Sequence, residues 1–209
     1  MRIEKLLTAP DRSGRYAVHF EDGTRMRLYR QTVEDFALYS GMEMSEDMYS
    51  SLVEAAGKMS AKMRAVRIIS ASSVSKRDLE QRLVQKGESP EDAKQAVSWL
   101  KDMNLLDDSK TAEQIVRSCI GKGYGLARAK QALYEKRIPK SLWDDALADY
   151  PVQEEAILSF LKGRLRSQYD AKDVKKAVDA LIRRGHSYAD IRRALNQLSS
   201  ELPDYLEEE

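Results

Sequence analysis

One stretch of this chain occurs three times, at residues 83–97, 133–147 and 181–195, with offsets of 50 and 48 residues. The shared register is marked by a leucine that recurs as Leu83, Leu133 and Leu181. A repeat of this period is typical of an array in which each unit buries its apolar face against its neighbours. Such arrays present a long surface and seldom enclose a catalytic pocket. The repeat therefore predicts a protein that acts by binding a partner.

From residue 62 onward the sequence predicts three helices in each repeat. The expected helices cover residues 62–72, 75–86 and 89–103, then 108–121, 125–136 and 140–149, then 153–167, 171–184 and 187–199. Their starts are signalled by capping residues, namely Ser75, Ser89 before Pro90, Asp107 or Asp108, and Ser187.

The second helix of each repeat is expected to end on a residue in the left-handed conformation. Gly87 and Gly185 occupy this place in the first and third repeats. The second repeat has Arg137 there, which would cost roughly 1 kcal/mol if the same dihedral is kept.

The first 60 residues do not belong to the repeat. Residues 15–20 and 24–29 alternate in polarity around an Asp-Gly turn, and residues 2–7 are a plausible third strand. Helices are expected at residues 31–40 and 45–62, the second one capped by Ser45. The prediction is a mainly α protein, with three tandem three-helix repeats that form a curved array. A small α+β cap with a β-hairpin or a three-stranded sheet precedes them.

The expected domain boundaries follow from this organisation. They are 1–60 for the N-terminal cap, 61–107, 108–151 and 152–199 for the three repeats, and 200–209 for an acidic tail.

The net charge of +1 conceals an uneven distribution. Residues 1–60 carry −2, residues 61–198 carry +8, and residues 199–209 carry −5. The third repeat alone carries +4 and is the most basic of the three. A basic body is compatible with binding to a polyanion, although solvated helix faces also explain a moderate excess of this kind.

Motifs for catalysis are largely missing from the sequence. No Gly-x-x-x-x-Gly-Lys-Ser/Thr loop occurs, and the glycines of residues 121–125 follow an expected helix, which favours a turn between helices. His19 and His186 are too few for a triad or a zinc site, and His186 is expected in an exposed turn. We expect no catalytic residue, metal or cofactor.

The remaining unusual side chains have ordinary explanations. The single Cys119 lies among apolar helix neighbours and is expected to be buried, and Trp99 and Trp143 are expected in the core. One cysteine fits a reducing compartment, and no run of 18 apolar residues or signal-type N-terminus is present, so we expect a cytoplasmic protein. Tyr124 differs because two glycines flank it, and we expect it to be an exposed contact residue, with core packing as the alternative.

Several segments resemble the RecX family, whose members regulate the RecA recombinase. Residues 65–87, with Ser75-Lys-Arg-Asp-Leu79, resemble the opening of that family. Residues 105–138, with Gly123-Tyr-Gly125, resemble its middle repeat, and residues 41–46 resemble the junction after the N-terminal cap. The likeness covers about residues 1–198.

The resemblance implies a modulator, most simply an inhibitor, that lies in the groove of the RecA–DNA filament. There it would limit filament growth, ATPase activity and strand exchange without catalytic residues of its own. The implied partners are the RecA filament and single- or double-stranded DNA, with no membrane, and the implied state is a monomer. Two departures from the family pattern stand out: residues 72–75 lack the usual Arg-x-Arg-Ser, and Arg137 replaces a glycine.

Charge and expected exposure select the candidate contact residues. They are Lys122, Tyr124, Arg128 and Lys130 in the second repeat, and Arg164, Arg166, Lys175, Lys176, Arg183, Arg184, Arg192 and Arg193 in the third. Two other functions stay open: a DNA-binding helical module that acts without RecA, and a helical-repeat adaptor that grips a peptide.

Overall fold

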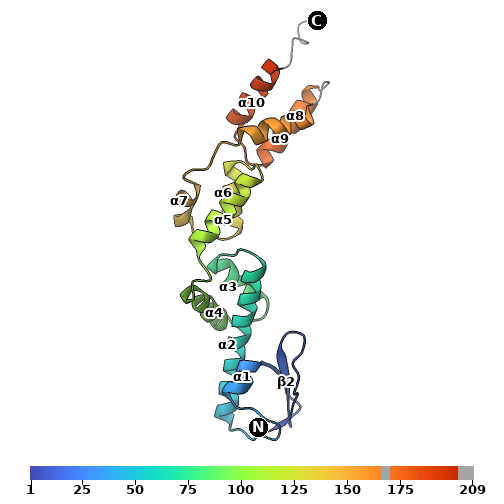
Figure 1. Cartoon of the computed structure of the whole chain (residues 1–209), viewed down its shortest axis with the longest axis vertical. Coiled ribbons are helices and arrows are strands. Elements are labelled where there is room, and N and C mark those ends of the chain that lie inside the picture. The colour runs from blue at the N-terminus through green and yellow to red at the C-terminus, as the bar shows by residue number, and fades with distance from the viewer. Residues whose placement is uncertain (166–169, 202–209) are drawn as a thin grey trace. The chain divides into compact units, whose positions relative to one another are not determined.

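In a computed structural model of the chain, residues 1–165 and 170–201 are described (Figure 1). The chain divides into two compact units between Leu106 and Asp107. Helices dominate both units, and the first also holds a small antiparallel sheet. This confirms the predicted fold class, mainly α with a three-stranded sheet in the N-terminal cap.

The sheet contains β1 (Ile3–Leu6), β2 (Arg15–Phe20) and β3 (Arg25–Tyr29), in that spatial order. Both neighbouring pairs are antiparallel. One face of the sheet is buried through Ile3, Val18, Phe20 and Leu28. The Phe20 ring meets the edge of Tyr49 with a centroid distance of 5.4 Å, so the sheet packs on the helix that carries Tyr49.

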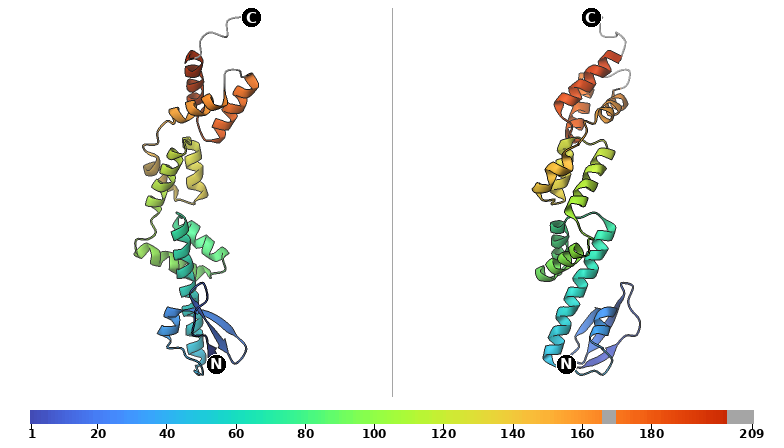
Figure 2. Two further views of the ribbon diagram at one scale, coloured as in Figure 1. Left: turned by 45° about the vertical axis from the view of Figure 1, so that its right-hand side comes forward. Right: turned by 60° about the vertical axis from the view of Figure 1, so that its left-hand side comes forward.

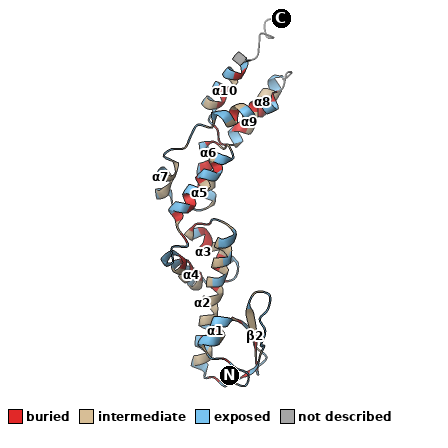
Figure 3. Cartoon of the chain, in the orientation of Figure 1, coloured by how far each residue is buried: buried red, intermediate tan, exposed pale blue. Residues whose placement is uncertain are grey.

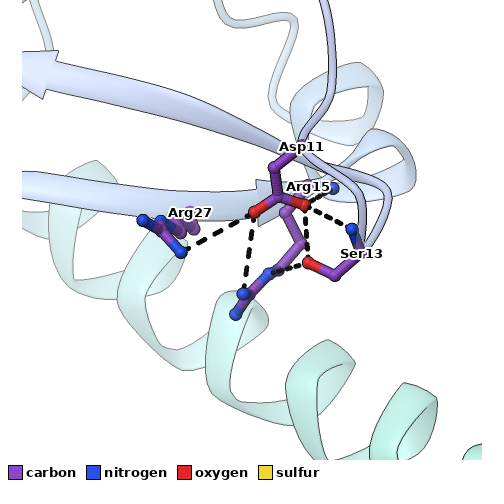
Figure 4. A network of polar contacts seen from close by, with 4 residues as sticks. All are labelled: Asp11, Ser13, Arg15 and Arg27. Carbon is purple, nitrogen blue, oxygen red and sulfur yellow. Dashed lines mark hydrogen bonds and ion pairs between the residues drawn. The ribbon is translucent and has the colours of Figure 1, made fainter.

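The connection between β1 and β2 is organised by the carboxylate of Asp11 (Figure 4). Its Oδ1 accepts hydrogen bonds from the Ser13 amide at 2.8 Å and the Arg15 amide at 3.1 Å. Its Oδ2 lies 3.8 Å from Arg27 Nη1 on β3. Hydrogen bonds from Ser13 and Arg15 hold the pKa of Asp11 at about 2. The carboxylate therefore stays ionised and ties the turn to the sheet.

The helices of the cap differ from the prediction. Helix α1 (Arg30–Asp35) is shorter than expected, and the two helices expected at 45–62 and 62–72 are one continuous helix, α2 (Glu46–Ala71). Nothing near residue 62 ends the helix, because the chain has neither a proline nor a helix cap there. Figure 2 shows α2 passing from the sheet into the first repeat.

The two halves of α2 belong to different hydrophobic cores. The first half, through Leu52 and Ala56, covers the sheet. The second half, from Ala61 onward, packs against α3 (Lys76–Gln85) and α4 (Pro90–Asp102). Ser75 and Ser89 cap these two helices as predicted. The first helix of the first repeat is thus an extension of the cap.

The second unit contains the other two repeats. Its first helices, α5 (Asp108–Gly121) and α6 (Leu126–Glu135), match the prediction, and Asp107 caps α5. The helix expected at 140–149 is instead a 3₁₀ turn, η1 (Lys140–Leu142), followed by the short α7 (Trp143–Leu147). The Trp143 indole donates to the carbonyl of Ile138 at 3.1 Å, which holds the short helix against the end of the preceding turn.

The third repeat consists of α8 (Glu154–Arg164), α9 (Ala171–Arg183) and α10 (Tyr188–Glu201). Its core is built from one side of each helix, through Ile157, Leu161, Leu181 and Ile191. Figure 3 colours the helices of the repeat by burial, with buried residues in red. As expected, Trp99 and Trp143 pack against the cores of their repeats.

The second helix of all three repeats ends in the same way. Gly87, Arg137 and Gly185 have φ angles of 92°, 56° and 88°. The residue after each one donates its amide to the carbonyl of the recurring leucine, in the bonds Glu88 to Leu83, Ile138 to Leu133 and His186 to Leu181. This pattern is the Schellman motif, in which the residue after the left-handed one is directed back onto the helix.

The Schellman motif corrects one prediction. Glu88, Ile138 and His186 are all buried, so His186 does not lie in an exposed turn. Buried Glu88 is balanced by hydrogen bonds from the Ser60 hydroxyl at 3.0 Å and from Arg64 Nε at 2.5 Å.

Candidate functional site

The turn between α5 and α6 brings Tyr124 close to the third repeat. Gly123 has a φ of 63°, and the Tyr124 amide donates to the carbonyl of Cys119 at 3.0 Å. Tyr124 therefore follows the left-handed residue of a Schellman motif, and a side chain at this position is directed back onto the helix. It is partly buried, whereas the sequence predicted an exposed residue.

Gly125 is needed for close backbone contact and not for a left-handed conformation. Its φ is −78°, which any residue adopts. Its amide donates to the carbonyl of Arg184 at 3.0 Å, and the amide of Ala127 donates to the carbonyl of Gly185 at 3.2 Å. A Cβ atom on Gly125 would collide with the backbone of Gly185, and one on Gly185 with the backbone of Arg128. The two glycines allow direct backbone contact between the second and third repeats.

Aromatic and basic side chains surround this contact. The guanidinium carbon of Arg184 lies 5.9 Å from the ring centroid of Tyr124 and 5.0 Å from that of Phe160 on α8. Arg164 lies 5.6 Å from the same Phe160 ring. The Tyr150 hydroxyl donates to the carbonyl of Tyr124 at 2.7 Å, and burial raises the pKa of Tyr150 to about 12.

His186 completes the contact between the repeats. It is 7% exposed, and its ring forms a hydrogen bond with the backbone of Gly123. Its Nε2 has no hydrogen-bond partner among the described residues. Burial lowers the pKa of His186, the bond to Gly123 opposes this shift, and the charge of Arg184 adds to it while Asp190 opposes it. The ring is therefore neutral near pH 7.

The candidate basic residues fall into two electrostatic classes. Three of them are paired with carboxylates: Arg128 with Glu135 at 3.0 Å, Lys176 with Asp173 at 3.1 Å and Arg193 with Asp190 at 3.4 Å. The others have no carboxylate partner among the described side chains of residues 1–165 and 170–199: Lys122, Lys130, Arg164, Lys175, Arg183, Arg184 and Arg192. The second class can bind an external anion without giving up an internal pair.

Exposure separates the candidates further. Arg128 and Arg184 are only partly exposed, whereas the described lysines and the other described arginines of the set are exposed. The structure brings Arg164 and Arg184 to the ring of Phe160, and Arg184 also lies beside Tyr124. Arg166 lies outside the described residues.

Phe160 was missed by sequence reasoning. Its spacing was a usable signal, because Phe160 and Arg164 are four residues apart on an expected helix and therefore share a face. No signal in the sequence places Arg184 against the same ring, since that contact depends on how α8 and α9 pack.

Other potential chemistry is limited. Cys119 is buried as predicted, and burial raises the pKa of its thiol. Across the described ranges, no three His, Cys, Asp or Glu side chains gather as a metal site would require. Within the same ranges, no helix has the length and apolar character needed to span a membrane.

Comparison with known proteins places these features in context. The family model for RecX, second three-helix domain, matches residues 107–147. Regulatory protein RecX of Vibrio campbellii is 32% identical over 152 residues, which cover 71% of this chain and 97% of that protein. Regulatory protein RecX of Clostridioides difficile is 26% identical over 203 residues, covering 94% of this chain and 95% of that protein.

Solved structures share the fold. A crystal structure of a regulatory protein RecX superimposes with a TM-score of 0.62 at 24% identity, covering 93% of this chain and 98% of that one. RecX from Lactobacillus salivarius gives a TM-score of 0.59 at 22% identity, covering 70% of this chain and 99% of that one.

Proposed function

The chain belongs to the RecX family of regulatory proteins, and on this premise we propose that it modulates a RecA recombinase by binding along the RecA–DNA filament. In this proposal the bound protein limits filament growth, ATPase activity and strand exchange during DNA repair and recombination. It acts without catalysis. A protein that binds across neighbouring subunits changes the free energy of adding or losing the next subunit, which is a linkage effect.

The observation that carries the proposal is the set of basic side chains without internal partners. Lys175 and Arg183 on α9 and Arg192 on α10 are exposed and have no carboxylate partner among the described residues. Lysine and arginine that contact DNA phosphates release counterions and so supply binding free energy. The third repeat is therefore the part of the chain best suited to the DNA held in the filament.

A second feature supports a partner made of identical subunits. The residue after the recurring buried leucine is a large apolar side chain in every repeat, and it is exposed each time: Val84 by 40%, Tyr134 by 65% and Ile182 by 46%. Single exposed apolar residues are common on protein surfaces. The same exposed position in three successive repeats suits a partner that offers the same contact more than once.

The test is the DNA-dependent ATPase activity of a bacterial RecA, titrated with this protein. We expect inhibition at ratios well below one protein per RecA subunit, because one bound molecule blocks the growth of a whole filament. Salt-dependent DNA binding with no effect on RecA would instead make the chain a separate DNA-binding module. Tight peptide binding that is insensitive to salt would make it an adaptor.

Two matched double variants test the basic surface. Lys175→Gln with Arg192→Gln removes two unpaired charges, and Lys176→Gln with Arg193→Gln removes two paired charges from the same two helices. We expect the first variant to weaken filament binding more and to lower the slope of log affinity against log salt by about 1.8, if both side chains contact phosphates. Equal effects of the two variants would contradict this assignment.

A further inference from the structure

Two arginines from different helices lie beside the ring of Phe160. Arg164 ends α8 and lies 5.6 Å from the ring centroid, and Arg184 caps α9 and lies 5.0 Å from it. A guanidinium within about 6 Å of an aromatic ring is attracted by the ring quadrupole. Both guanidinium groups therefore lie beside the same ring.

Among the side chains described in residues 1–165 and 170–199, no carboxylate is paired with either guanidinium, in contrast to Arg128, Lys176 and Arg193. Each of these charges attracts an anion, and an anion that contacts both guanidinium groups would be attracted by both. Arginine presents planar donors that match a phosphate group in a bidentate arrangement.

The position of Arg184 is fixed by the backbone around it. Its carbonyl accepts the Gly125 amide at 3.0 Å, and its guanidinium also reaches the ring of Tyr124 at 5.9 Å. The carbonyl of Tyr124 is held in turn by the Tyr150 hydroxyl. Donors that are already ordered lose less conformational entropy on binding than free surface side chains.

We propose that Arg164 and Arg184, held over Phe160, bind a backbone phosphate of a nucleic-acid strand. Arg184 contacts Tyr124 of the second repeat as well as Phe160 of the third, so occupation of the site depends on how these two repeats pack. This inference rests on the proposed function, because the DNA of the filament supplies the phosphate. A free nucleotide presents the same chemistry, and the experiment below distinguishes the two sources.

The site is tested on the full chain, without RecA, by fluorescence anisotropy of a labelled oligothymidylate. We expect Arg164→Gln and Arg184→Gln each to weaken binding about ten-fold, the effect of losing one charge-assisted hydrogen bond. Each should also lower the salt slope by about 0.7. The matched control is Arg67→Gln, which removes an exposed arginine of α2 that has no carboxylate partner among the described residues. Site variants that bind no more weakly than Arg67→Gln overturn the proposal.

Two further variants separate the site from general electrostatics and from folding. Arg184→Lys keeps the charge but loses the planar contact with both rings, and we expect it to bind nearly as weakly as Arg184→Gln. Full rescue by lysine would mean that only net charge matters, which contradicts a built site. If Arg184→Gln lowers the melting temperature strongly, Arg164→Gln still tests the site, because Arg164 is exposed and its replacement should leave the fold intact.

Competition identifies the source of the phosphate. A nucleoside triphosphate that displaces the oligonucleotide at an equal concentration of phosphate would assign the site to free nucleotides and overturn the strand assignment. We expect displacement only by a second strand. The oligonucleotide experiment contains no RecA, so it tests the phosphate site separately from the proposed function. If the chain binds the oligonucleotide normally but has no effect on the ATPase activity of RecA, the proposed function is rejected and the phosphate site is retained.

Discussion

The second helix of every repeat ends on a left-handed residue, and only the second repeat uses a side chain there. Arg137 has a φ of 56°, which is strained for any residue with a Cβ atom. We expect Arg137→Gly to raise the free energy of unfolding by about 1 kcal/mol, because the strain disappears. Urea unfolding followed by circular dichroism measures the change. A loss of stability would mean that contacts of the Arg137 side chain outweigh the strain.

The glycines at the equivalent positions separate backbone strain from close contact. Gly87 and Gly185 have φ angles of 92° and 88°, but a Cβ atom on Gly87 meets nothing within 4 Å, whereas one on Gly185 would collide with Arg128. We expect Gly87→Ala to cost about 1 kcal/mol and Gly185→Ala about 2–4 kcal/mol, since the second change adds overpacking to the strain. If both substitutions lower the free energy of unfolding equally in the same urea experiment, the backbone at the contact between the repeats shifts to accommodate the added Cβ atom.

His186 predicts a pH dependence of stability. Burial lowers its pKa in the folded protein below the ordinary value of 6.5, so the unfolded chain binds a proton more readily. The stabilisation by neutral His186 is complete above pH 6.5 and is lost as the pH falls from there toward the folded pKa. We expect the melting temperature to fall over that window, and His186→Gln to remove this part of the fall.

Proton resonances give a direct check, since the chain has only two histidines, His19 and His186. We expect one signal to titrate below pH 6.5, and His186→Gln to delete that signal. A pKa of His186 at or above 6.5 would contradict its burial.

At these positions the sequence predicted the backbone better than the side chains. The left-handed residues were expected from two glycines and a shared register, because backbone conformation depends on local chemistry. Burial of the next position was missed, since it holds Glu88, Ile138 and His186, three residues with no common polarity. Aligning the repeats at Ile138 would have shown that this position faces a core.

At the scale of elements, α2 shows why the boundary between cap and repeats was hard to read. It was predicted as two helices, because the first repeat was expected to begin near residue 62 with a helix of its own. The halves serve two cores, with Ala56 the last residue of one and Ala61 the first of the other. A helix has no need to end where its buried face changes partner, so the periodicity alone did not predict the continuity.

This division of α2 allows the cap to be removed. A chain that begins at Ser60 keeps Ala61 and Ala65 in the first repeat, as well as the bonds from Ser60 and Arg64 to Glu88. We expect it to remain helical and to unfold cooperatively. The control chain begins at Ser72 and lacks all of α2, and we expect it to lose the structure of the first repeat. Similar unfolding of the two chains, followed by circular dichroism in urea, would place the boundary elsewhere.

The short helix of the second repeat marks another limit of sequence reasoning. A full helix was expected at 140–149, but the segment forms the turn η1 and the five residues of α7. The packing of Trp143, Ala146 and Leu147 on α5 is retained, so the core position survives although the helix is short. Apolar spacing predicted which residues pack against the core, and the length of the element depended on local bonds such as that from Trp143 to Ile138.

At the scale of the whole molecule, the three repeats share a fold but differ in charge. The first two carry +2 each and the third carries +4, counted over residues 61–107, 108–151 and 152–199. The exposed apolar position is common to all three, whereas the Arg164–Phe160–Arg184 cluster occurs only in the third. In the proposed function this separates two tasks: the repeated apolar position meets identical RecA subunits, and the basic third repeat meets DNA.

Substitution of the repeated position tests this separation. We expect the triple variant Val84→Ser, Tyr134→Ser and Ile182→Ser to lose much of its inhibition of RecA ATPase, because each change removes one contact of a multivalent set. Oligonucleotide affinity and its salt slope should stay unchanged, since no charge is altered. Each residue is at least 40% exposed, so each substitution should change the free energy of unfolding by less than about 0.5 kcal/mol.

The control variant also removes exposed apolar side chains, but from places outside the repeated position. Leu105→Ser with Val152→Ser removes side chains that are 55% and 59% exposed and that lie outside the repeated exposed position. We expect this variant to inhibit RecA normally. If it loses as much inhibition per substitution as the triple variant, the apolar contacts do not follow the repeat. A filament of identical RecA subunits can distinguish the two sets of apolar residues only through their spacing along the chain. A difference between the two variants would therefore indicate that the period of the repeats matches that of the filament.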